Sequence, residues 1–207
     1  MSSRLPTDGP SHFPSVAFDL VVLAASAGGL RALSTVASGL PADFGAALAA
    51  VQHLDPRHRS LMAEILSRRT RLRVAQAADG DRLAPATLFI APPDRHLLVN
   101  PDGTLSLSQT ELVRFLRPSA DLLLESAAAS YKDRLIAVIL TGSGSDGAMG
   151  LRAVKKTGGT VLAQDEATSE FHGMPSAAIA TGYVDFVLPL EEIPGALLTL
   201  IASGEVD

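Results

Sequence analysis

Hydrophobic residues in this chain follow two alternating patterns: short uninterrupted runs, and longer stretches with helical spacing. Residues 20–24 form an apolar run of strand length, and residues 30–40 then repeat apolar side chains every three or four positions. The pattern predicts further strands at 46–51, 72–75, 87–90, 134–140, 160–163 and 186–188, and further helices at 60–69, 119–131, 148–157, from 174 onward and 193–202. Strands that alternate with helices predict a mainly parallel, doubly wound, Rossmann-like α/β sheet with helices on both faces.

Two segments depart from this alternation. Residues 96–99 and 104–107 are two short, largely apolar segments on either side of an Asn-Pro-Asp-Gly turn, which predicts a small β-hairpin. Residues 1–15 are polar and contain three prolines, without the apolar core of a signal peptide, and we expect them to form a flexible leader. The remaining residues, 16–207, are expected to form a single domain.

Composition excludes several classes of function. The net charge of −5 and the 4% aromatic content do not suit a nucleic-acid-binding protein. The chain has no Cys, which removes disulfides, thiolate nucleophiles and Cys–zinc sites and fits a reducing cytoplasm. No apolar run approaches the roughly 20 residues that span a bilayer, so membrane insertion is not expected. The charge and aromatic content likewise lead us to expect no nucleic-acid partner.

Three chemically capable residues directly follow three predicted strands: Ser26, His53 and Asp146. Ligands of open parallel sheets bind at the carboxyl ends of the strands, where such residues meet. A hydroxyl nucleophile, an imidazole base and an orienting carboxylate are the groups that acyl transfer requires. Each also has a structural interpretation, since Ser and Asp commonly cap helices and form turns.

A competing motif lies in the segment after residue 140. Gly142, Gly144 and Gly147 form a G-x-G-x-x-G pattern after a predicted strand and before a predicted helix, with Asp165 at the end of the next strand. This is the pattern of a dinucleotide-binding loop, in which glycines let a pyrophosphate approach a helix N-terminus. A dinucleotide-binding module is therefore one alternative function.

Six blocks along the chain extend these observations. They are AASAGGLRAL, VQHLDPRHRSL, APPDRHLLV, FLRPSADLLLESAA, VILTGSGSDGAMGL and QDEATSEFHGMPSAAIATGYVDFVLPLEEI. In this order they resemble the CheB-type protein-glutamate methylesterase domain, over about residues 18–202. The resemblance implies a cytoplasmic serine hydrolase that removes methyl groups from glutamyl methyl esters of chemoreceptors and can deamidate particular receptor glutamines. It requires neither metal nor organic cofactor.

The resemblance assigns roles to individual residues. Ser26, His53 and Asp146 match the family's catalytic triad, and the backbone N–H groups of Ala27 and Ser143 match the oxyanion donors, with Gly28 beside them in the substrate-binding turn. The family commonly has Thr and Met where this chain has Ala27 and Ser143, which changes the shape of the ester pocket but keeps both backbone donors. Among the other histidines, His172 is the second candidate for the base, although we favour a role in packing its loop, and we expect His96 to be exposed.

Partners follow from the same resemblance. We expect a methylated chemoreceptor cytoplasmic region or a related sensor protein as the substrate. Family members commonly carry a receiver domain ahead of the catalytic blocks, which here begin near residue 18; we therefore expect a stand-alone domain, constitutively active or gated by a receiver or sensor kinase in trans. A catalytically silent domain that docks on a receptor or kinase is the other alternative. The basic run could contact an acidic partner or be a solvated helix face; its members are Arg57, Arg59, Arg68, Arg69, Arg71 and Arg73.

Overall fold

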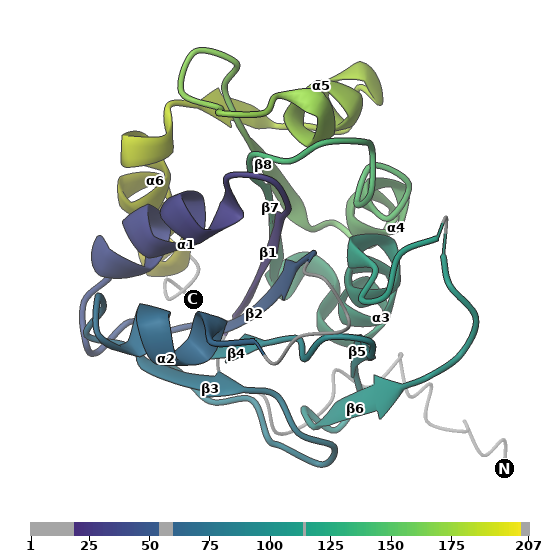
Figure 1. Ribbon diagram of the computed structural model, residues 1–207. Helices are drawn as coiled ribbons and strands as arrows, with labels where there is room; N and C mark the ends of the chain where they lie inside the picture. Colours follow the sequence, from purple (N-terminus) through teal and green to yellow (C-terminus); the bar gives the residue numbers. More distant parts are fainter. Residues whose placement is uncertain (1–18, 54–59, 114, 204–207) are drawn as a thin grey trace, which may run out of the picture.

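A seven-stranded parallel sheet forms the centre of the protein (Figure 1). The computed structural model describes residues 19–53, 60–113 and 115–203. The strands lie in the order β3-β4-β2-β1-β7-β8-β9. Their bounds are β1 Leu20–Ala25, β2 Ala47–Gln52, β3 Arg73–Gln76, β4 Thr87–Ile90, β7 Leu135–Ile139, β8 Thr160–Gln164 and β9 Phe186–Leu188. The predicted α/β class is confirmed.

Helices cover both faces of the sheet because its central strands are apolar on both sides. Leu20, Val22 and Ala24 of β1 belong to one core, and the alternate residues of the strand belong to the other. The first core is closed by α3 (Ala120–Tyr131), α4 (Leu151–Lys156) and α5 (Gly173–Ala180). The second is closed by α1 (Gly29–Ser38), α2 (Met62–Ser67) and α6 (Ile193–Ser203), which lie on the opposite side of the sheet in Figure 1.

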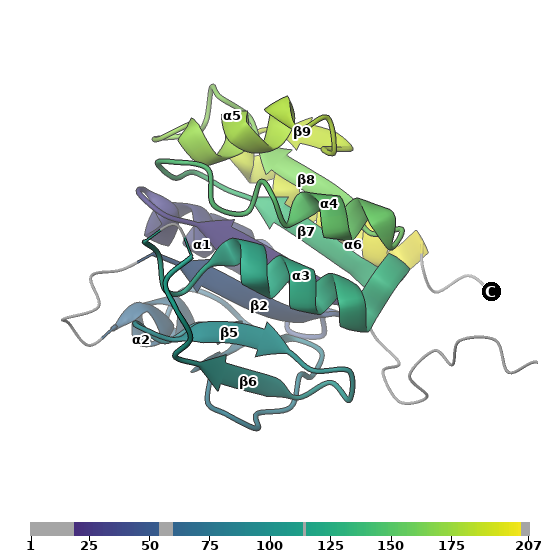
Figure 2. The ribbon, with the colours of Figure 1, turned by 90° about the vertical axis from the view of Figure 1, so that its right-hand side faces the viewer.

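The predicted β-hairpin packs against the α3 side of the molecule (Figure 2). It consists of β5 (His96–Val99) and β6 (Leu105–Ser108), which pair antiparallel. Its turn contains Gly103 with a φ of 79°, a conformation that glycine adopts without steric cost. Two short 3-10 helices, Lys132–Arg134 and Leu190–Glu192, complete the secondary structure of the described residues.

Two helices are shorter than the sequence pattern predicts. α2 ends at Ser67; Met62 and Leu66 are its buried residues, and the two arginines that follow it are exposed. α4 begins at Leu151, three residues later than expected, because residues 146–150 form turns instead. Those turns are tied to the start of α3, where Asp121 Oδ1 accepts the Gly150 N–H at 2.8 Å.

Two features concern the chain as a whole. The predicted leader, residues 1–15, lies outside the described residues. Within the described part of the chain, no helix combines the length and apolar character needed to cross a membrane.

The order of strands places a crevice beside β1. From β1 the chain passes through α1, on one face, to β2; from β7, the other neighbour of β1, it passes through α4, on the opposite face, to β8. The connections after β1 and β7 therefore diverge and leave an opening at their carboxyl ends. This is where parallel α/β sheets bind ligands, and it is where Ser26 and the segment 141–146 lie.

Candidate active site

Strand register brings Ser26 and His53 to neighbouring positions. Ala25 of β1 pairs with Gln52 of β2, so the next residue of each strand lies at the same edge of the sheet. The His53 N–H donates to the Ala25 carbonyl at 3.3 Å, which continues the ladder by one step. Adjacent strands are about 4.8 Å apart, so the two side chains leave neighbouring backbones.

Asp146 reaches the same place from the far side of β1. Its Oδ2 atom accepts a hydrogen bond from His53 Nε2 at 2.8 Å, although 93 residues separate the two in sequence. The side chains are 12% and 2% exposed, respectively, so the bond is shielded from water. Because Nε2 carries this bond, Nδ1 is the ring nitrogen left for another partner.

Asp146 is held by the first turn of α3. Oδ2 also accepts the Ala120 N–H at 2.6 Å, and Oδ1 accepts the Asp121 N–H at 3.2 Å and the Ser119 hydroxyl at 3.0 Å. Burial by itself would raise the pKa of Asp146, but the hydrogen bonds from His53 and from these backbone N–H groups outweigh it and lower the pKa below its ordinary value. Asp146 therefore stays ionised at neutral pH.

This lowered pKa has a testable effect on stability. An ionised Asp146 stabilises the folded state fully above its ordinary pKa of 3.8, and the contribution disappears as the pH falls through the lower folded-state pKa. We expect the difference in free energy of unfolding between the wild type and Asp146→Asn to be constant above about pH 5 and to shrink as the pH falls below about 4. Urea denaturation of both proteins measures it. A difference that also stays constant below about pH 4 would contradict the lowered pKa.

The turn after β1 presents the Ser26 side chain at the crevice. The Ser26 N–H donates to the Thr141 carbonyl at 3.0 Å, and the Ser26 carbonyl accepts from the Gly29 N–H at 2.8 Å. Gly28 has a φ of 76°, which the tight turn requires and which glycine adopts readily. Within the described part of the chain, Ser26 Oγ forms no hydrogen bond, so the hydroxyl is not consumed by helix capping.

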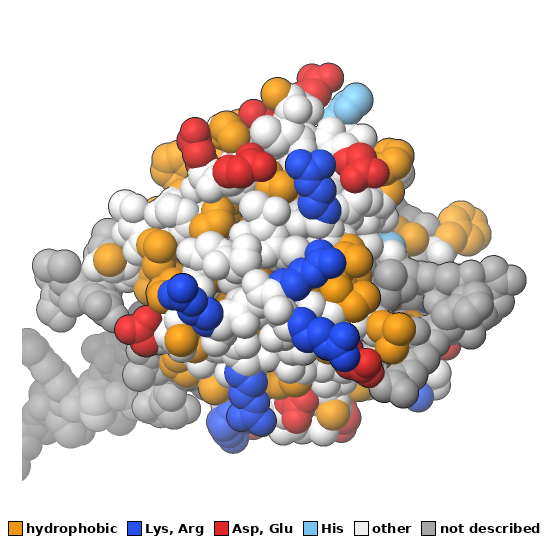
Figure 3. All heavy atoms as spheres, turned by 60° about the vertical axis from the view of Figure 1, so that its left-hand side comes forward, with side chains coloured by type: hydrophobic (Ala, Val, Ile, Leu, Met, Phe, Trp, Pro, Cys, Tyr) orange, Lys and Arg blue, Asp and Glu red, His pale blue; other side chains and the backbone are white. Residues whose placement is uncertain are grey.

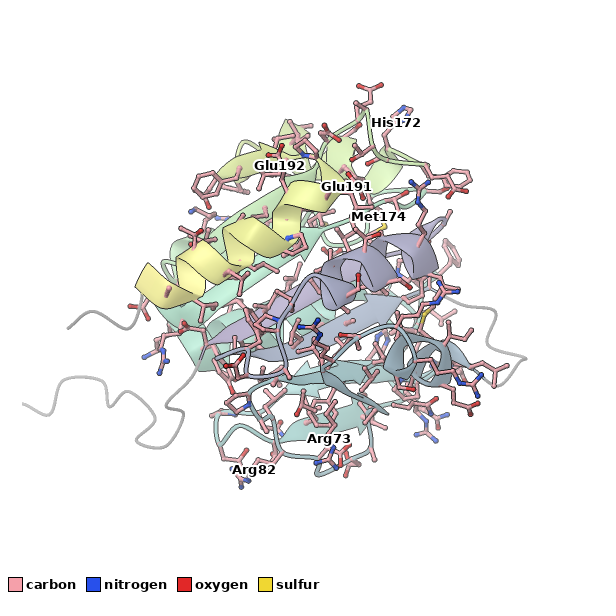
Figure 4. All side chains as sticks on the ribbon, turned by 90° about the vertical axis from the view of Figure 1, so that its left-hand side faces the viewer. Arg73, Arg82, His172, Met174, Glu191 and Glu192 are labelled. Atoms are coloured by element: carbon pink, nitrogen blue, oxygen red, sulfur yellow. The ribbon has the colours of Figure 1, made fainter. Side chains whose placement is uncertain are left out.

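Gly142 is where the two crevice loops touch. A Cβ atom on Gly142 would lie 2.8 Å from Ser26 Cβ and would overlap the sulfur of Met174. Met174 is 1% exposed and points into the body of the protein, as Figure 4 shows. The absence of a side chain at Gly142 thus lets the loop after β7 approach Ser26 directly.

Two backbone N–H groups beside Ser26 are available to a ligand. Across the described residues, the N–H groups of Ala27 and Ser143 have no hydrogen-bond acceptor, whereas that of Gly142 donates to the Phe171 carbonyl at 2.8 Å. The Thr141 hydroxyl lies 3.1 Å from the carbonyl oxygens of both Ala27 and Phe171 and joins the two loops. The predicted oxyanion donors are therefore unpaired, on loops that meet at Gly142.

Comparisons with known proteins identify the family. Residues 21–197 match the family model described as CheB methylesterase. The chain belongs to the CheB methylesterase family. This confirms the predicted family and the predicted class of enzyme, protein-glutamate methylesterase.

Individual relatives agree with this membership. The crystal structure of the Thermotoga maritima CheB methylesterase catalytic domain has a TM-score of 0.86 and 39% identity, and the match covers 90% of this chain and 100% of that one. Protein-glutamate methylesterase/protein-glutamine glutaminase 2 of Anaeromyxobacter dehalogenans is 47% identical over 182 residues, and protein-glutamate methylesterase FrzG of Myxococcus xanthus is 44% identical over 185. The matches cover 88% and 89% of this chain but only 53% and 55% of those proteins, so the chain spans about half of their length.

Gln52 is a site residue that the sequence analysis missed in this CheB-family domain. It is 5% exposed, and its Nε2 atom donates to the Ser26 carbonyl at 2.7 Å and to the His53 carbonyl at 3.1 Å. The side chain therefore ties together the backbones of the hydroxyl and imidazole residues. The only indication in the sequence was that Gln52 is a polar residue at the end of an otherwise apolar strand. Polar residues are also common at strand ends that have no functional role.

Two histidine predictions were wrong. His96 is fully buried, not exposed: its Nδ1 accepts the Ser119 N–H at 3.2 Å, and its Nε2 donates to the Glu111 carbonyl at 3.1 Å. The segment after β6 folds back over the hairpin, and this burial cannot be seen in the local charge pattern. His172 does not pack within its loop, since its side chain is 58% exposed and lies at the outer end of the loop before α5 in Figure 4.

The dinucleotide-binding interpretation is not supported by the glycine positions. In such a loop the glycines open a helix, but α4 begins four residues after Gly147 and has only six residues. Gly142 is required by contact with Ser26 and Met174, as described above. Asp165, which would bind a ribose, accepts the N–H and hydroxyl of Thr168 at 2.9 and 2.6 Å. Across the described residues, no group of three or more His, Cys, Asp or Glu side chains is arranged to hold a metal ion.

The described members of the basic run do not form a separate binding patch. Arg57 and Arg59 lie outside the described residues, whereas the other four arginines of the run are exposed at the end of α2 and the start of β3. On the face that carries α1, α2 and α6, Lys and Arg side chains are spread out, with Asp and Glu side chains among them (Figure 3). This distribution favours the interpretation of a solvated surface.

Proposed function

We propose that this domain hydrolyses γ-glutamyl methyl esters of chemoreceptors with Ser26 as nucleophile, His53 as general base and Asp146 as orienting carboxylate. One observation carries the assignment: within a CheB methylesterase domain, His53 lies beside Ser26 at the ends of paired strands while its imidazole is bonded to buried, ionised Asp146 at 2.8 Å. This combination of nucleophile, base and orienting group is the minimum that acyl transfer through a serine ester needs.

The first step is the attack of Ser26 Oγ on the ester carbonyl. His53 accepts the hydroxyl proton through Nδ1, since Nε2 is engaged by Asp146. The resulting imidazolium is stabilised by the Asp146 carboxylate, which remains ionised and fixes the ring orientation. The His53–Asp146 pair thereby activates an alcohol that is otherwise a weak nucleophile at neutral pH.

The developing negative charge falls on the ester oxygen. The N–H groups of Ala27 and Ser143 are the donors that bind it, with the Gly28 turn beside them. The N-terminus of α1, which begins at Gly29, adds the partial positive charge of its unpaired N–H groups. Donors of this kind each contribute about a hundred- to a thousandfold in rate because they are fixed before the charge develops.

Collapse of the tetrahedral intermediate completes acylation. The C–O bond to the methoxy group breaks, and methanol leaves with the proton held by His53. Water then attacks the Ser26 ester, again with His53 as base, and releases a glutamate side chain and free Ser26. The same steps on a glutamine side chain release ammonia, so receptor glutamine deamidation belongs to the proposal, as the name of the Anaeromyxobacter relative suggests.

The proposal also names partners and a location. The substrate is the methylated cytoplasmic region of a chemoreceptor or of a related sensor protein, so the domain acts in the cytoplasm. A receiver protein or sensor kinase supplied in trans is the proposed regulator. The name of the Myxococcus relative, protein-glutamate methylesterase, supports the same substrate chemistry.

Gln52 offers a prediction about positioning. Gln52→Met keeps the side-chain length but removes the donor to the Ser26 and His53 carbonyls. We expect kcat to fall about 10- to 100-fold, with little change in KM, because small displacements of reacting groups are costly. Steady-state kinetics on a methyl-esterified receptor fragment measure both constants. Gln76→Met, at the exposed end of β3, is the matched control; equal kinetics for the two variants would refute a positioning role.

Methanol release from a chemoreceptor cytoplasmic fragment carrying tritiated methyl esters tests the function itself. A serine esterase releases volatile tritium, and a fluorophosphonate probe labels Ser26. A silent docking domain instead binds the fragment without releasing tritium. Binding of the fragment with no release, by a protein whose Ser26 does not react with the probe, would refute the proposed catalytic function.

A further inference from the structure

Several exposed apolar side chains lie on segments that connect to the candidate site. Among the described residues, several large hydrophobic side chains are more than 40% exposed on segments that touch the site. Phe171 supplies the carbonyl that binds the Gly142 N–H, Met149 lies three residues after Asp146, and Leu112 and Phe115 lie on the segment that leads into α3. Exposed apolar groups that surround a site commonly mark a binding surface.

Phe115 stands out among them. Its side chain is 93% exposed, and its backbone has a φ of 67°, in the left-handed region that bulky residues avoid. Val113 and Leu116 exchange two backbone hydrogen bonds, at 3.1 and 2.8 Å, so the chain reverses tightly at this point. The conformation costs free energy, and burial of the ring within this domain does not offset that cost.

A rigid base supports this turn. The Arg117 guanidinium donates to Asp94 Oδ1 through two nitrogens, at 2.6 and 2.9 Å, and to the carbonyls of Thr110 and Gln109, at 2.8 and 3.3 Å. Figure 1 shows the segment between β6 and α3 extending away from the body of the protein. Its apolar tip is thus held out by a network of charge-assisted hydrogen bonds.

The same segment is attached to the proposed catalytic carboxylate. Ser119, which follows it, donates through its hydroxyl to Asp146 Oδ1, and its N–H donates to buried His96, which in turn holds the Glu111 carbonyl. Ser119 lies four positions after Phe115, so their Cα atoms are at most about 14 Å apart. The Ser119 hydroxyl bonds to Asp146, so the turn adjoins the segment that holds the candidate site, and a protein substrate is large enough to contact both.

We propose that Phe115, supported by Leu112, is a docking anchor for the protein substrate. The substrate it fits is a protein segment with an apolar side chain near the esterified glutamyl residue. This inference rests on the proposed function and adds a determinant of protein substrate recognition. Aromatic side chains dominate binding at interfaces, and an anchor held in place beforehand loses little conformational entropy on binding.

Two substrates with the same reacting bond separate docking from chemistry. One is the tritiated chemoreceptor fragment; the other is the γ-methyl ester of N-acetylglutamate methylamide, which has no surface for Phe115 to contact. Phe115→Asn removes the ring but keeps a residue that tolerates a left-handed backbone. We expect its KM for the receptor fragment to rise about tenfold or more, with kcat/KM for the small ester within about twofold of the wild type.

Phe186→Asn is the matched control. Phe186 is 47% exposed, but it lies at the start of β9, on the edge strand and away from Ser26. We expect this variant to match the wild type on both substrates. An unchanged KM for the receptor fragment in Phe115→Asn, or an equal loss on both substrates, would overturn the docking role while leaving the esterase intact.

A binding measurement tests the docking role of Phe115 without relying on esterase activity. Calorimetry of the unmodified receptor fragment with Ser26→Ala, and with Ser26→Ala combined with Phe115→Asn, measures docking alone. Weaker binding in the double variant supports the anchor even if no esterase activity is found. Equal binding, or a loss of self-association by Phe115→Asn with receptor binding unchanged, assigns the surface to another occupant and overturns the proposal.

Discussion

Ser26→Ala is expected to abolish methanol release and leave the fold intact. Without the hydroxyl no acyl-enzyme forms, and loss of a serine nucleophile typically lowers kcat by about 10⁴-fold or more. Within the described residues, Ser26 Oγ makes no hydrogen bond, so its removal should change the free energy of unfolding by less than about 1 kcal/mol. Tritium release and thermal denaturation of the same preparation measure the two effects.

Ser34→Ala is the matched control for this experiment. Ser34 lies in α1, the helix that Ser26 precedes, and its hydroxyl donates to the Leu30 carbonyl at 2.7 Å. Its loss affects the helix locally and should leave turnover unchanged. Full turnover by a folded Ser26→Ala protein would show that another group attacks the ester, whereas an unfolded variant would indicate that Ser26 is structural.

Asp146→Asn is expected to lower kcat by about 10⁴-fold. An amide in place of the carboxylate neither stabilises the imidazolium nor fixes the productive tautomer of His53. The fluorophosphonate labelling rate of Ser26 should fall in parallel with kcat, since both depend on the same proton transfer. An Asn variant that keeps more than about a tenth of wild-type kcat would exclude Asp146 from the triad.

The same substitution should also destabilise the fold. Both oxygens of Asp146 accept hydrogen bonds, so an amide N–H₂ at either position faces a donor: the Ala120 N–H at one, the Asp121 N–H at the other. We expect a cost of about 1–3 kcal/mol, the usual penalty for a buried donor left without an acceptor. Ser119→Ala removes only one hydrogen bond to Asp146 and leaves the carboxylate in place. It should therefore lower the free energy of unfolding with a much smaller loss of kcat, which separates the structural effect from the catalytic one.

Much of the site could be predicted because strand ends are visible in the sequence. Apolar runs at β1, β2 and β7 mark where the strands stop, and in a parallel sheet these ends lie at one edge. Ser26, His53 and Asp146 could therefore be grouped without knowing any contact. The structure shows the His53–Asp146 hydrogen bond, while the roles of the three residues in catalysis are for the variants above to test.

Other features depend on contacts that no local pattern encodes. Gln52 resembles any polar residue at the end of a strand until the carbonyls of Ser26 and His53 are found on its amide. His96 lies in a charged stretch, but the segment before α3 folds over it. The glycines after β7 match a dinucleotide-binding pattern, and only the close approach of Gly142 to Ser26 and Met174 shows a different purpose for that position.

Sequence alone thus determined which segments are strands, which are helices, and which residues follow each strand. The reason is that burial of a strand or helix face imposes a pattern of apolar residues that can be read from positions close together in the sequence. Tertiary structure alone decided that the start of α3 holds Asp146, that two loops meet at Gly142, and that Phe115 is exposed at the tip of an anchored turn. These arrangements join segments tens of residues apart, and the packing of the whole sheet sets the distances between them.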